Sequence, residues 1–209
     1  MLYKNKGSRE DPSKYRCIAL LNHAYKVLSI ILLGRLLQIS DGFLKDWQAG
    51  FRETRGCRCR NNSMIFRVLC ENMMELGKAL AVVFIDYSAA FDSVSHKFVD
   101  EALGQAGASP KVRAIYRAIC CGCGLHLGPR VNNKQVRCDP FPINRGVLQG
   151  DVTSPLFFIM TLELILRRHD AVSENKGVPL ADIIAHLLGS ADDVAIMEVG
   201  DPAGVQQLA

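Results

Sequence analysis

A carboxylate at the end of a short apolar run is the feature that most constrains this chain. The run Ala81–Phe84 is β-branched in its middle and leads through Ile85 into Asp86, with Gly77 and Lys78 before it. This pattern predicts a buried strand that presents Asp86 at its end. A carboxylate placed there is costly unless it caps a turn, binds a cation or accepts hydrogen bonds.

A second acidic site lies far along the chain. The apolar runs 183–188 and 194–197 are separated by a Gly-Ser-Ala-Asp-Asp stretch that contains Asp192 and Asp193. Two such runs predict a hairpin with paired carboxylates at its tip. One strand-end Asp and two hairpin-tip Asp residues can hold two hard divalent cations between them. That arrangement suits in-line phosphoryl or nucleotidyl transfer.

The positive charge of the chain is concentrated near its N-terminus. The 209 residues carry a net charge of +4. Residues 1–60 contain twelve Lys and Arg against five Asp and Glu, a net charge of +7, so the remainder carries −3. A basic segment followed by an acidic metal-binding segment suits a polyanionic substrate. A merely solvated basic face explains the charge equally well, so both readings stay open.

The cysteines and the N-terminus bear on where the protein works. The eight cysteines show no matched CxxC pairs and no spaced histidines, which disfavours zinc. Met1–Lys6 is polar and is not a signal peptide, and no apolar stretch approaches the ~18 residues of a membrane span. We therefore expect reduced thiols and an intracellular protein of the nucleus or cytoplasm, not secreted and without a membrane partner.

Periodicity and capping residues predict the other elements. Residues 22–38 and 65–76 are expected to be helices, and residues 1–15 a loop or a frayed start. Further helices are expected to begin at Ser93 or Ser95, at Ser109–Pro110, at Ser154–Pro155 and after Gly200, with a hairpin formed by 125–131 and 134–141. Helices and strands alternate irregularly, which predicts an α+β fold rather than a doubly wound parallel sheet.

Five segments, in this order, resemble the reverse transcriptase domain of non-LTR (LINE-like) retrotransposons. They are similar to the fingers stretch YRPISLL, the QxGFRxxR segment, the first catalytic motif, the nucleotide-pocket motif RGxxQGxxxSP and the metal-binding YADD hairpin. The matching residues are 15–21, 48–56, 84–94, 145–155 and 188–193.

The resemblance implies an RNA-directed DNA polymerase that extends a DNA primer on an RNA template with deoxynucleoside triphosphates. It implies fingers and palm of a right-hand polymerase, with an antiparallel palm sheet packed on helices and the thumb missing. Fingers would span 1–80, with 107–148 also fingers-like, and palm would span 81–106 and 149–209. The chain would be a fragment of the element's polyprotein, or a decayed or domesticated copy.

The resemblance also assigns the metal ligands. Asp86 and Asp192 would be the principal ligands of two Mg²⁺ ions, with Mn²⁺ as an alternative, and Asp193 would lie beside them. Tyr87, counted with the nucleotide-binding residues, would offer its backbone carbonyl as a further candidate ligand.

Other positions would contact the nucleotide or the template. Phe91 would block a 2′-hydroxyl and so select deoxynucleotides. Arg16 would pair with the triphosphate, a task suited to a permanently charged guanidinium. Gln149 and Gly150 would border the nucleotide and the template base. The Arg52–Arg60 stretch would lie near the template backbone, a contact independent of sequence.

Two departures from the family pattern bear on activity. Ser190 stands where the family usually has tyrosine, which predicts weaker positioning of the primer, and Cys17 replaces a proline. The alternative function is a catalytically dead or domesticated nucleic-acid-binding remnant of such a domain. An RNA-dependent RNA polymerase shares the paired Asp motifs, but Phe91 argues against it, because such an enzyme must accept the 2′-hydroxyl.

Overall fold

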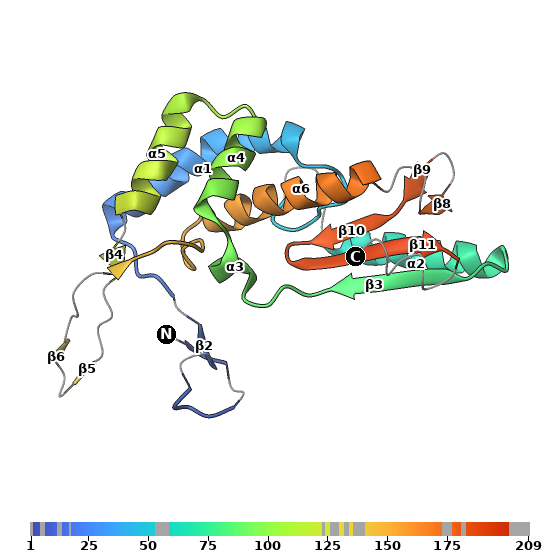
Figure 1. The fold of residues 1–209 in the computed structure, drawn as a ribbon, viewed down its shortest axis with the longest axis horizontal. Helices are drawn as coiled ribbons and strands as arrows, with labels where there is room; N and C mark the ends of the chain where they lie inside the picture. Colours follow the sequence, from blue (N-terminus) through green and yellow to red (C-terminus); the bar gives the residue numbers. More distant parts are fainter. Residues whose placement is uncertain are drawn as a thin grey trace. The chain divides into compact units, whose positions relative to one another are not determined.

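The computed structural model places the described elements in two compact units (Figure 1). It describes residues 2–4, 7–11, 14–16, 18–52, 59–122, 124–125, 130–131, 134–135, 141–172, 177–180 and 183–200. Unit 1 comprises residues 1–39 and 91–154, and unit 2 comprises residues 40–90 and 155–209. Each unit is therefore assembled from two separate stretches of the sequence.

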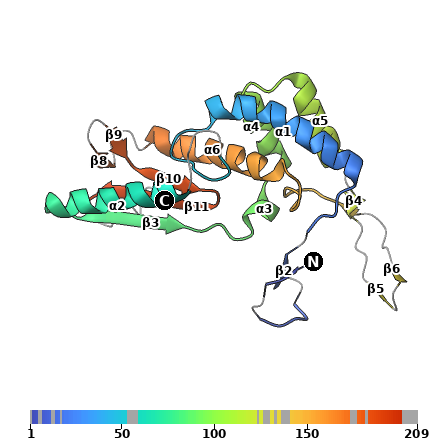
Figure 2. The same cartoon turned by 180° about the vertical axis from the view of Figure 1, so that it is seen from behind.

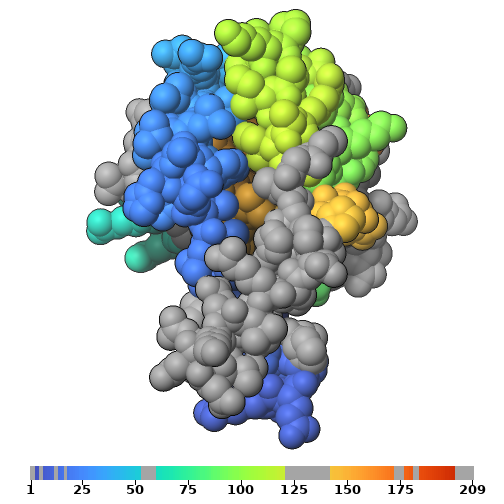
Figure 3. Space-filling model, turned by 90° about the vertical axis from the view of Figure 1, so that its left-hand side faces the viewer, coloured from blue at the N-terminus to red at the C-terminus, as the bar shows by residue number. Residues whose placement is uncertain are grey.

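Helices form a large part of the described residues of unit 1. These helices are α1 (His23–Phe43), α3 (Ala90–Ser93), α4 (His96–Gln105) and α5 (Pro110–Gly122). The unit boundary falls inside two of them, so α1 belongs to unit 1 only up to Ile39 and α3 only from Phe91. The Asn22 side chain accepts a hydrogen bond from the Tyr25 N–H at 2.7 Å, which caps the start of α1. Figure 3 shows α1 (blue) and α5 (yellow-green) side by side on the surface.

The helices α4 and α5 begin where the capping residues predict. Ser95 is the residue before α4, although its hydroxyl makes no capping hydrogen bond. Gly107 has a φ of +82° in the connection, and the Ser109 hydroxyl accepts from the Val112 N–H at 3.4 Å at the start of α5. The expected starts at Ser95 and Ser109–Pro110 are confirmed.

Unit 1 also contains three short antiparallel pairs. β4 (Gly124–Leu125) pairs with β7 (Phe141–Pro142), and β5 (Arg130–Val131) pairs with β6 (Lys134–Gln135), which confirms the expected hairpin in its described residues. The expectation of a loop over residues 1–15 is wrong in part. β1 (Leu2–Tyr3) pairs with β2 (Tyr15–Arg16), and the Tyr3 and Tyr15 rings, opposite each other in the pair, lie 5.4 Å apart.

Unit 2 is built on a three-stranded antiparallel sheet in the order β10–β11–β3. Its strands are β3 (Leu80–Ile85), β10 (Leu187–Ser190) and β11 (Asp193–Val199). A separate pair joins β8 (Val178–Leu180) to β9 (Ile183–Ala185). The run 183–188, expected as one strand, is thus divided at His186 between two sheets.

The helix α2 (Cys59–Glu75) lies along one face of this sheet, in front of it in Figure 2. Leu69 and Met73 pack in one buried cluster with Leu188, Ala195 and Met197 of β10 and β11. The expected amphipathic helix is confirmed, since its apolar stripe faces the sheet. Burying this stripe supplies much of the core of unit 2.

The helix α6 (Ser154–Val172) begins at the predicted Ser-Pro pair and is apolar on more than one face. Ile159 and Met160 are fully buried, and so is the side chain of Glu163. A carboxylate at such a site needs a partner, and Arg167 donates to it at 2.9 Å. Burial nevertheless raises the pKa of the Glu163 carboxyl.

The α+β class with an antiparallel sheet is confirmed. The expectation that the strand before Asp86 is buried is wrong for most of its residues: Ala81 alone in β3 is buried, and Phe84 is 73% exposed on this edge strand. The helix expected after Gly200 and the motif residue Cys17 lie outside the described residues. Among the described helices, none is long and apolar enough to cross a membrane. The intracellular location stays a prediction.

Candidate functional site

The ends of neighbouring strands bring two carboxylates together in unit 2. β3 and β11 pair antiparallel as far as Ile85 and Val194. The next residues at this end are Asp86 and Asp193, so the register sets them opposite each other. Asp192 lies in the turn between β10 and β11. The expected hairpin is confirmed, as Figure 1 shows for β10 and β11. Asp192 and Asp193 lie next to each other in sequence at its tip.

A pocket of about 300 Å³ opens beside these carboxylates. Asp86, Asp193 and Ser190 are among its polar lining residues, and the Phe66 and Phe84 rings, edge to face at 5.9 Å, form part of its apolar lining. The remaining lining residues are Asn62, Ser63, Ile85, Leu188, Val194 and Ala195. Ser190 thus brings a small hydroxyl to the pocket lining where a tyrosine would bring a ring.

The three carboxylates supply the oxygen ligands that hard divalent cations prefer. In the described part of the chain, Asp86, Asp192 and Asp193 form no hydrogen bond or ion pair that would occupy their oxygens. The same part contains no group of three or more His, Cys, Asp or Glu side chains close enough to hold a metal ion. The carboxylate oxygens of Asp86, Asp192 and Asp193 fit a divalent cation by their chemistry, but as placed they do not form such a group. Metal binding by these residues stays a prediction.

Tyr87 follows the first carboxylate directly. Burial raises the pKa of its phenol, so this side chain stays neutral and offers no anionic oxygen to a metal. The role predicted for Tyr87 would be carried by its backbone carbonyl, which titration of the ring does not affect, and it stays a prediction.

The loop before α2 supports the hairpin turn, a function that sequence reasoning missed. Gln48 is only 1% exposed, and its side-chain amide binds the backbone of Ala191. Asn62, on α2, donates to the Gly189 carbonyl at 2.7 Å. The QxGFR segment is the sequence signal that marks Gln48, but nothing in its spacing indicates that Gln48 binds a residue as distant in sequence as Ala191.

Arg52 corrects another expectation. Its side chain is 3% exposed and donates to the carbonyls of Lys45 at 2.7 Å and Gln48 at 3.2 Å. This guanidinium therefore holds the loop together and is not available to a template backbone. Residues 53–58 of the expected template-contacting stretch lie outside the described residues.

In unit 1, the 145–151 loop brings together three of the predicted nucleotide-binding residues. The Val147 N–H donates to the Phe91 carbonyl at 2.9 Å, and the Gln149 side chain donates to Asp92 at 3.4 Å. The Gln149 carbonyl accepts from the Ala19 N–H at 2.8 Å. Phe91 and Gln149 thus belong to one hydrogen-bonded arrangement within this unit, and Gly150 follows Gln149 in the same loop.

Gly150 is required at its position for two reasons. Its φ is +112°, a conformation that side chains rarely adopt, and a Cβ there would lie 2.9 Å from the Ala19 carbonyl oxygen. The neighbouring Asp151, buried, accepts from Thr153 at 2.5 Å and from the Tyr25 hydroxyl at 3.1 Å. Asp151 was not among the predicted site residues, yet it fixes this loop to α1.

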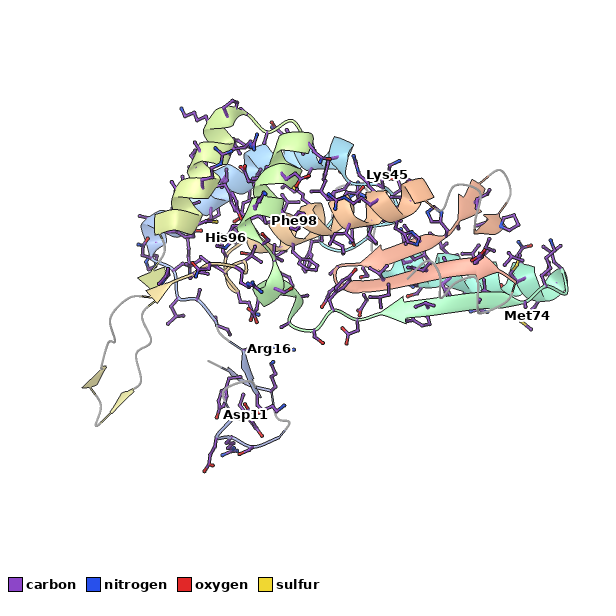
Figure 4. The ribbon with its side chains drawn as sticks, in the orientation of Figure 1. Asp11, Arg16, Lys45, Met74, His96 and Phe98 are labelled. Atoms are coloured by element: carbon purple, nitrogen blue, oxygen red, sulfur yellow. The ribbon has the colours of Figure 1, made fainter. Side chains whose placement is uncertain are left out.

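Arg16 is not part of that arrangement. It lies on the short β1–β2 pair and is exposed (Figure 4). The described contacts do not link its guanidinium to Gln149 or Phe91. Its predicted contact with a triphosphate stays a prediction.

The sequence of residues 3–203 matches one family model, which is described as reverse transcriptase (RNA-dependent DNA polymerase). The chain belongs to the reverse transcriptase family.

This reverse transcriptase domain is similar to polyproteins of retrotransposable elements. It is 27% identical over 197 residues to the retrovirus-related Pol polyprotein from type-1 retrotransposable element R2 of Popillia japonica, covering 93% of this chain and 26% of that protein. It is 27% identical over 185 residues to the corresponding polyprotein from element R2DM of Drosophila melanogaster, covering 88% and 16%. The predicted resemblance to non-LTR retrotransposon domains is confirmed, and the chain spans about a quarter or less of these relatives.

The domain also resembles solved telomerase structures. Apo telomerase from Candida tropicalis, truncated from its C-terminal domain, matches with a TM-score of 0.60 at 10% identity, covering 91% of this chain and 40% of that chain. Telomerase from the same organism, in complex with a fragment of telomeric RNA, matches with a TM-score of 0.59 at 10% identity, covering 89% and 30%. This likeness confirms the expected polymerase fold of fingers and palm.

Proposed function

We propose that this chain is an RNA-directed DNA polymerase domain that adds deoxynucleotides to the 3′-hydroxyl of a DNA primer on an RNA template. The observation that carries the proposal is the register of β3 and β11, which sets Asp86 opposite Asp193 beside the turn that holds Asp192. Membership of the reverse transcriptase family supports the reaction class. The template, the primer and deoxynucleoside triphosphates are the proposed partners.

The three aspartates would hold divalent cations, which we propose to be two Mg²⁺ ions or Mn²⁺ in their place, with the Tyr87 carbonyl as a further ligand. Such ions, when bound, generate a nucleophile from the primer hydroxyl and stabilise charge on the leaving pyrophosphate. The chain's own contribution is to set the oxygen ligands. The β3–β11 ladder fixes Asp86 and Asp193, and the hairpin turn carries Asp192.

Nucleotide selection is assigned to unit 1. The Phe91 ring would exclude a 2′-hydroxyl, and Gln149 and Gly150 would border the incoming nucleotide and the template base. The contacts that link the 145–151 loop to Phe91 and Ala19 support this assignment. Arg16 would bind the triphosphate. The division into fingers over 1–80 and 107–148 and palm over 81–106 and 149–209 stays a prediction.

The test is primer extension on an RNA template with deoxynucleotides and Mg²⁺, comparing the wild type with Asp86→Asn and Asp192→Asn. Each substitution replaces a carboxylate ligand with a neutral amide. We expect each to lower the rate by about 1,000-fold, because a metal contributes several kcal/mol and each 1.4 kcal/mol is about tenfold.

The matched control is Glu75→Gln, which removes an exposed carboxylate from α2 of the same unit and should leave extension unchanged. Extension that persists in Asp86→Asn or Asp192→Asn would contradict the metal assignment. Nucleic-acid binding by a wild type that extends no primer would favour the non-catalytic remnant instead.

A further inference from the structure

The Gln48 side chain holds the hairpin turn from outside the hairpin. Its Oε1 accepts from the Gly50 N–H at 2.8 Å and from the Ala191 N–H at 3.0 Å, and its Nε2 donates to the Ala191 carbonyl at 3.3 Å. Both backbone polar groups of Ala191 are therefore bound by one amide. Because Gln48 is almost fully buried, loss of the amide would leave buried backbone groups unpaired.

Two neighbours complete this arrangement, which we name the Gln48 clamp: Gln48, Gly50 and Asn62. Gly50 lies so close to the turn that a Cβ on it would be 2.1 Å from the Ala191 nitrogen. Asn62 binds the Gly189 carbonyl on the strand that enters the turn. Gly189 also exchanges backbone hydrogen bonds with Trp47 and Ala49, each at 2.8 Å. The turn is thus fixed at its tip and at its base.

The conformation of Ala191 explains why such support matters. Its φ is +59°, in the left-handed region that a residue with a side chain adopts only at a cost. The usual turn residues for this region are Gly, Asn or Asp. Hydrogen bonds to both polar groups of Ala191 hold the residue in that conformation. The peptide that leads into Asp192 is therefore fixed by Gln48.

We propose that Gln48 is a positioning residue for the carboxylates of Asp192 and Asp193, and that the Gln48 clamp sets the metal affinity of the hairpin. This inference rests on the proposed function, which makes these carboxylates metal ligands. Groups that hold the ligands of a metal typically change its affinity by about 10- to 100-fold when they are removed. Gln48 reaches no metal itself; it acts through the turn.

The test measures Mn²⁺ binding to the full 209-residue chain by the electron paramagnetic resonance signal of free Mn²⁺, beside thermal unfolding followed by circular dichroism. Gln48→Met keeps an unbranched side chain of similar length and removes all three hydrogen bonds. We expect it to raise the Mn²⁺ dissociation constant about 10-fold. Asn62→Ala, which lies on the partly exposed surface of α2, should raise it by a smaller factor in the same direction.

The matched control for stability is Met73→Ala, which opens a cavity in the buried cluster between α2 and the sheet. It should lower the unfolding temperature at least as much as Gln48→Met, yet keep the Mn²⁺ dissociation constant within about twofold while the chain is folded. If Gln48 contributes only to stability, Gln48→Met and Met73→Ala should change the Mn²⁺ dissociation constant equally. That result would overturn the proposal.

Asp86→Asn and Asp192→Asn separate the two ways in which the proposal can fail. If these substitutions weaken Mn²⁺ binding and both clamp variants bind as the wild type does, the Gln48 clamp alone is contradicted. If the wild type shows no Mn²⁺ binding that depends on these aspartates, the metal site of the proposed function fails and the clamp fails with it. Weaker binding in Gln48→Met and Asn62→Ala, but not in Met73→Ala, supports the proposal.

Discussion

Two backbone hydrogen bonds link the segment that contains Phe91 to the 145–151 loop. The Phe91 carbonyl accepts from the Val147 N–H at 2.9 Å, and the Val94 carbonyl accepts from the Gly146 N–H at 2.7 Å. Gly146 has a φ of +90°, and a Cβ on it would meet the Asp92 carbonyl at 3.0 Å. The Phe91 segment and the 145–151 loop are therefore held rigidly together within unit 1.

We expect truncation of Phe91 to weaken the selection of deoxynucleotides over ribonucleotides. Phe91→Ala removes the ring that would meet a 2′-hydroxyl, while the backbone contacts of the segment persist. We expect the preference for deoxynucleotides over ribonucleotides, measured as a ratio of kcat/KM values in primer extension, to fall by about 10- to 100-fold, the range that steric selection in a pocket typically supplies.

Phe98→Ala is the matched control for this prediction. Phe98 is a partly exposed phenylalanine on α4 of the same unit (Figure 4), and its loss should leave the sugar preference unchanged. If Phe91→Ala keeps the wild-type preference for deoxynucleotides, the Phe91 ring no longer argues against an RNA polymerase.

Sequence patterns predicted Asp86 at a strand end and Asp192 and Asp193 at a hairpin tip, because each of these placements is local; their joint metal site stays a prediction. They did not predict the role of Gln48 or the burial of Arg52. Both depend on contacts between distant segments, and a polar residue in a turn-rich stretch has the same sequence signature whether it is solvated or buried. Phe84 was misjudged for a related reason: strand composition does not reveal which strand lies at the edge of a sheet.

At the level of elements, α4 and α5 are joined by a carboxylate with two partners. Asp100 on α4 accepts from Arg113 at 2.6 Å and from Arg117 at 2.8 Å, both on α5. Each arginine makes a second bond to the other carboxylate oxygen, at 3.1 Å. These hydrogen bonds lower the pKa of Asp100 to about 2, from an ordinary value of 3.8. Asp100 therefore binds both arginines in its ionised form.

Loss of this carboxylate should destabilise the helix pair. Asp100→Asn is expected to lower the free energy of unfolding by about 1–2 kcal/mol at pH 7, allowing for partial exposure. Because the folded-state pKa is depressed, the stabilisation is complete above pH 3.8 and is lost as the pH falls to about 2. Urea unfolding followed by circular dichroism over this pH range should show the wild type and the variant converging.

Glu101→Gln tests whether the effect belongs to Asp100. Glu101 is the adjacent carboxylate on α4, and it accepts a hydrogen bond from Gln105 at an exposed site. Its neutralisation should change stability by less than about 0.5 kcal/mol. A difference between Asp100→Asn and the wild type that stays constant from pH 7 to pH 2 would contradict the assignment to the ionised carboxylate.

Helix starts were predictable wherever a cap and an apolar stripe agreed, as for α4, α5 and α6. No cap was predicted for α2, and this helix begins at Cys59, well before the expected start at residue 65. Short strands were less predictable. The β1–β2 pair joins segments with few apolar residues, and it depends on the contact between Tyr3 and Tyr15. The apolar run 183–188 divides into two strands at His186 because β9 pairs with β8 and β10 pairs with β11. A continuous apolar run does not indicate that its two halves pair with different strands.

At the scale of the whole chain, charge divides between the two units. Unit 1 carries fifteen Lys and Arg against seven Asp and Glu, a net charge of +8, whereas unit 2 carries ten against fourteen, a net charge of −4. The predicted metal ligands and Tyr87 lie in the acidic unit, and the other predicted nucleotide contacts, Arg16, Phe91, Gln149 and Gly150, lie in the basic one. This division refines the sequence-based contrast between the first 60 residues and the remainder.

The charge division predicts how nucleic acid binds. Affinity for an RNA–DNA duplex should fall steeply with salt, because phosphate contacts release counterions and each contributes about 0.9 to the slope of log K against log salt. The double variant Lys26→Gln/Lys111→Gln, exposed in unit 1, should weaken binding at least about threefold at low salt. Lys45→Gln/Lys78→Gln, exposed in unit 2, is the matched control and should have a smaller effect.

Asp86→Asn completes this experiment, because it separates binding from catalysis. Metal ligation does not contribute to the phosphate contacts of unit 1, so fluorescence anisotropy in the absence of divalent cations should give an affinity within about twofold of the wild type. The same variant should extend the primer about 1,000-fold more slowly than the wild type. Equal losses of binding from the unit 1 and unit 2 lysine pairs would show that attraction to nucleic acid follows the total charge of the chain and not its division between the units.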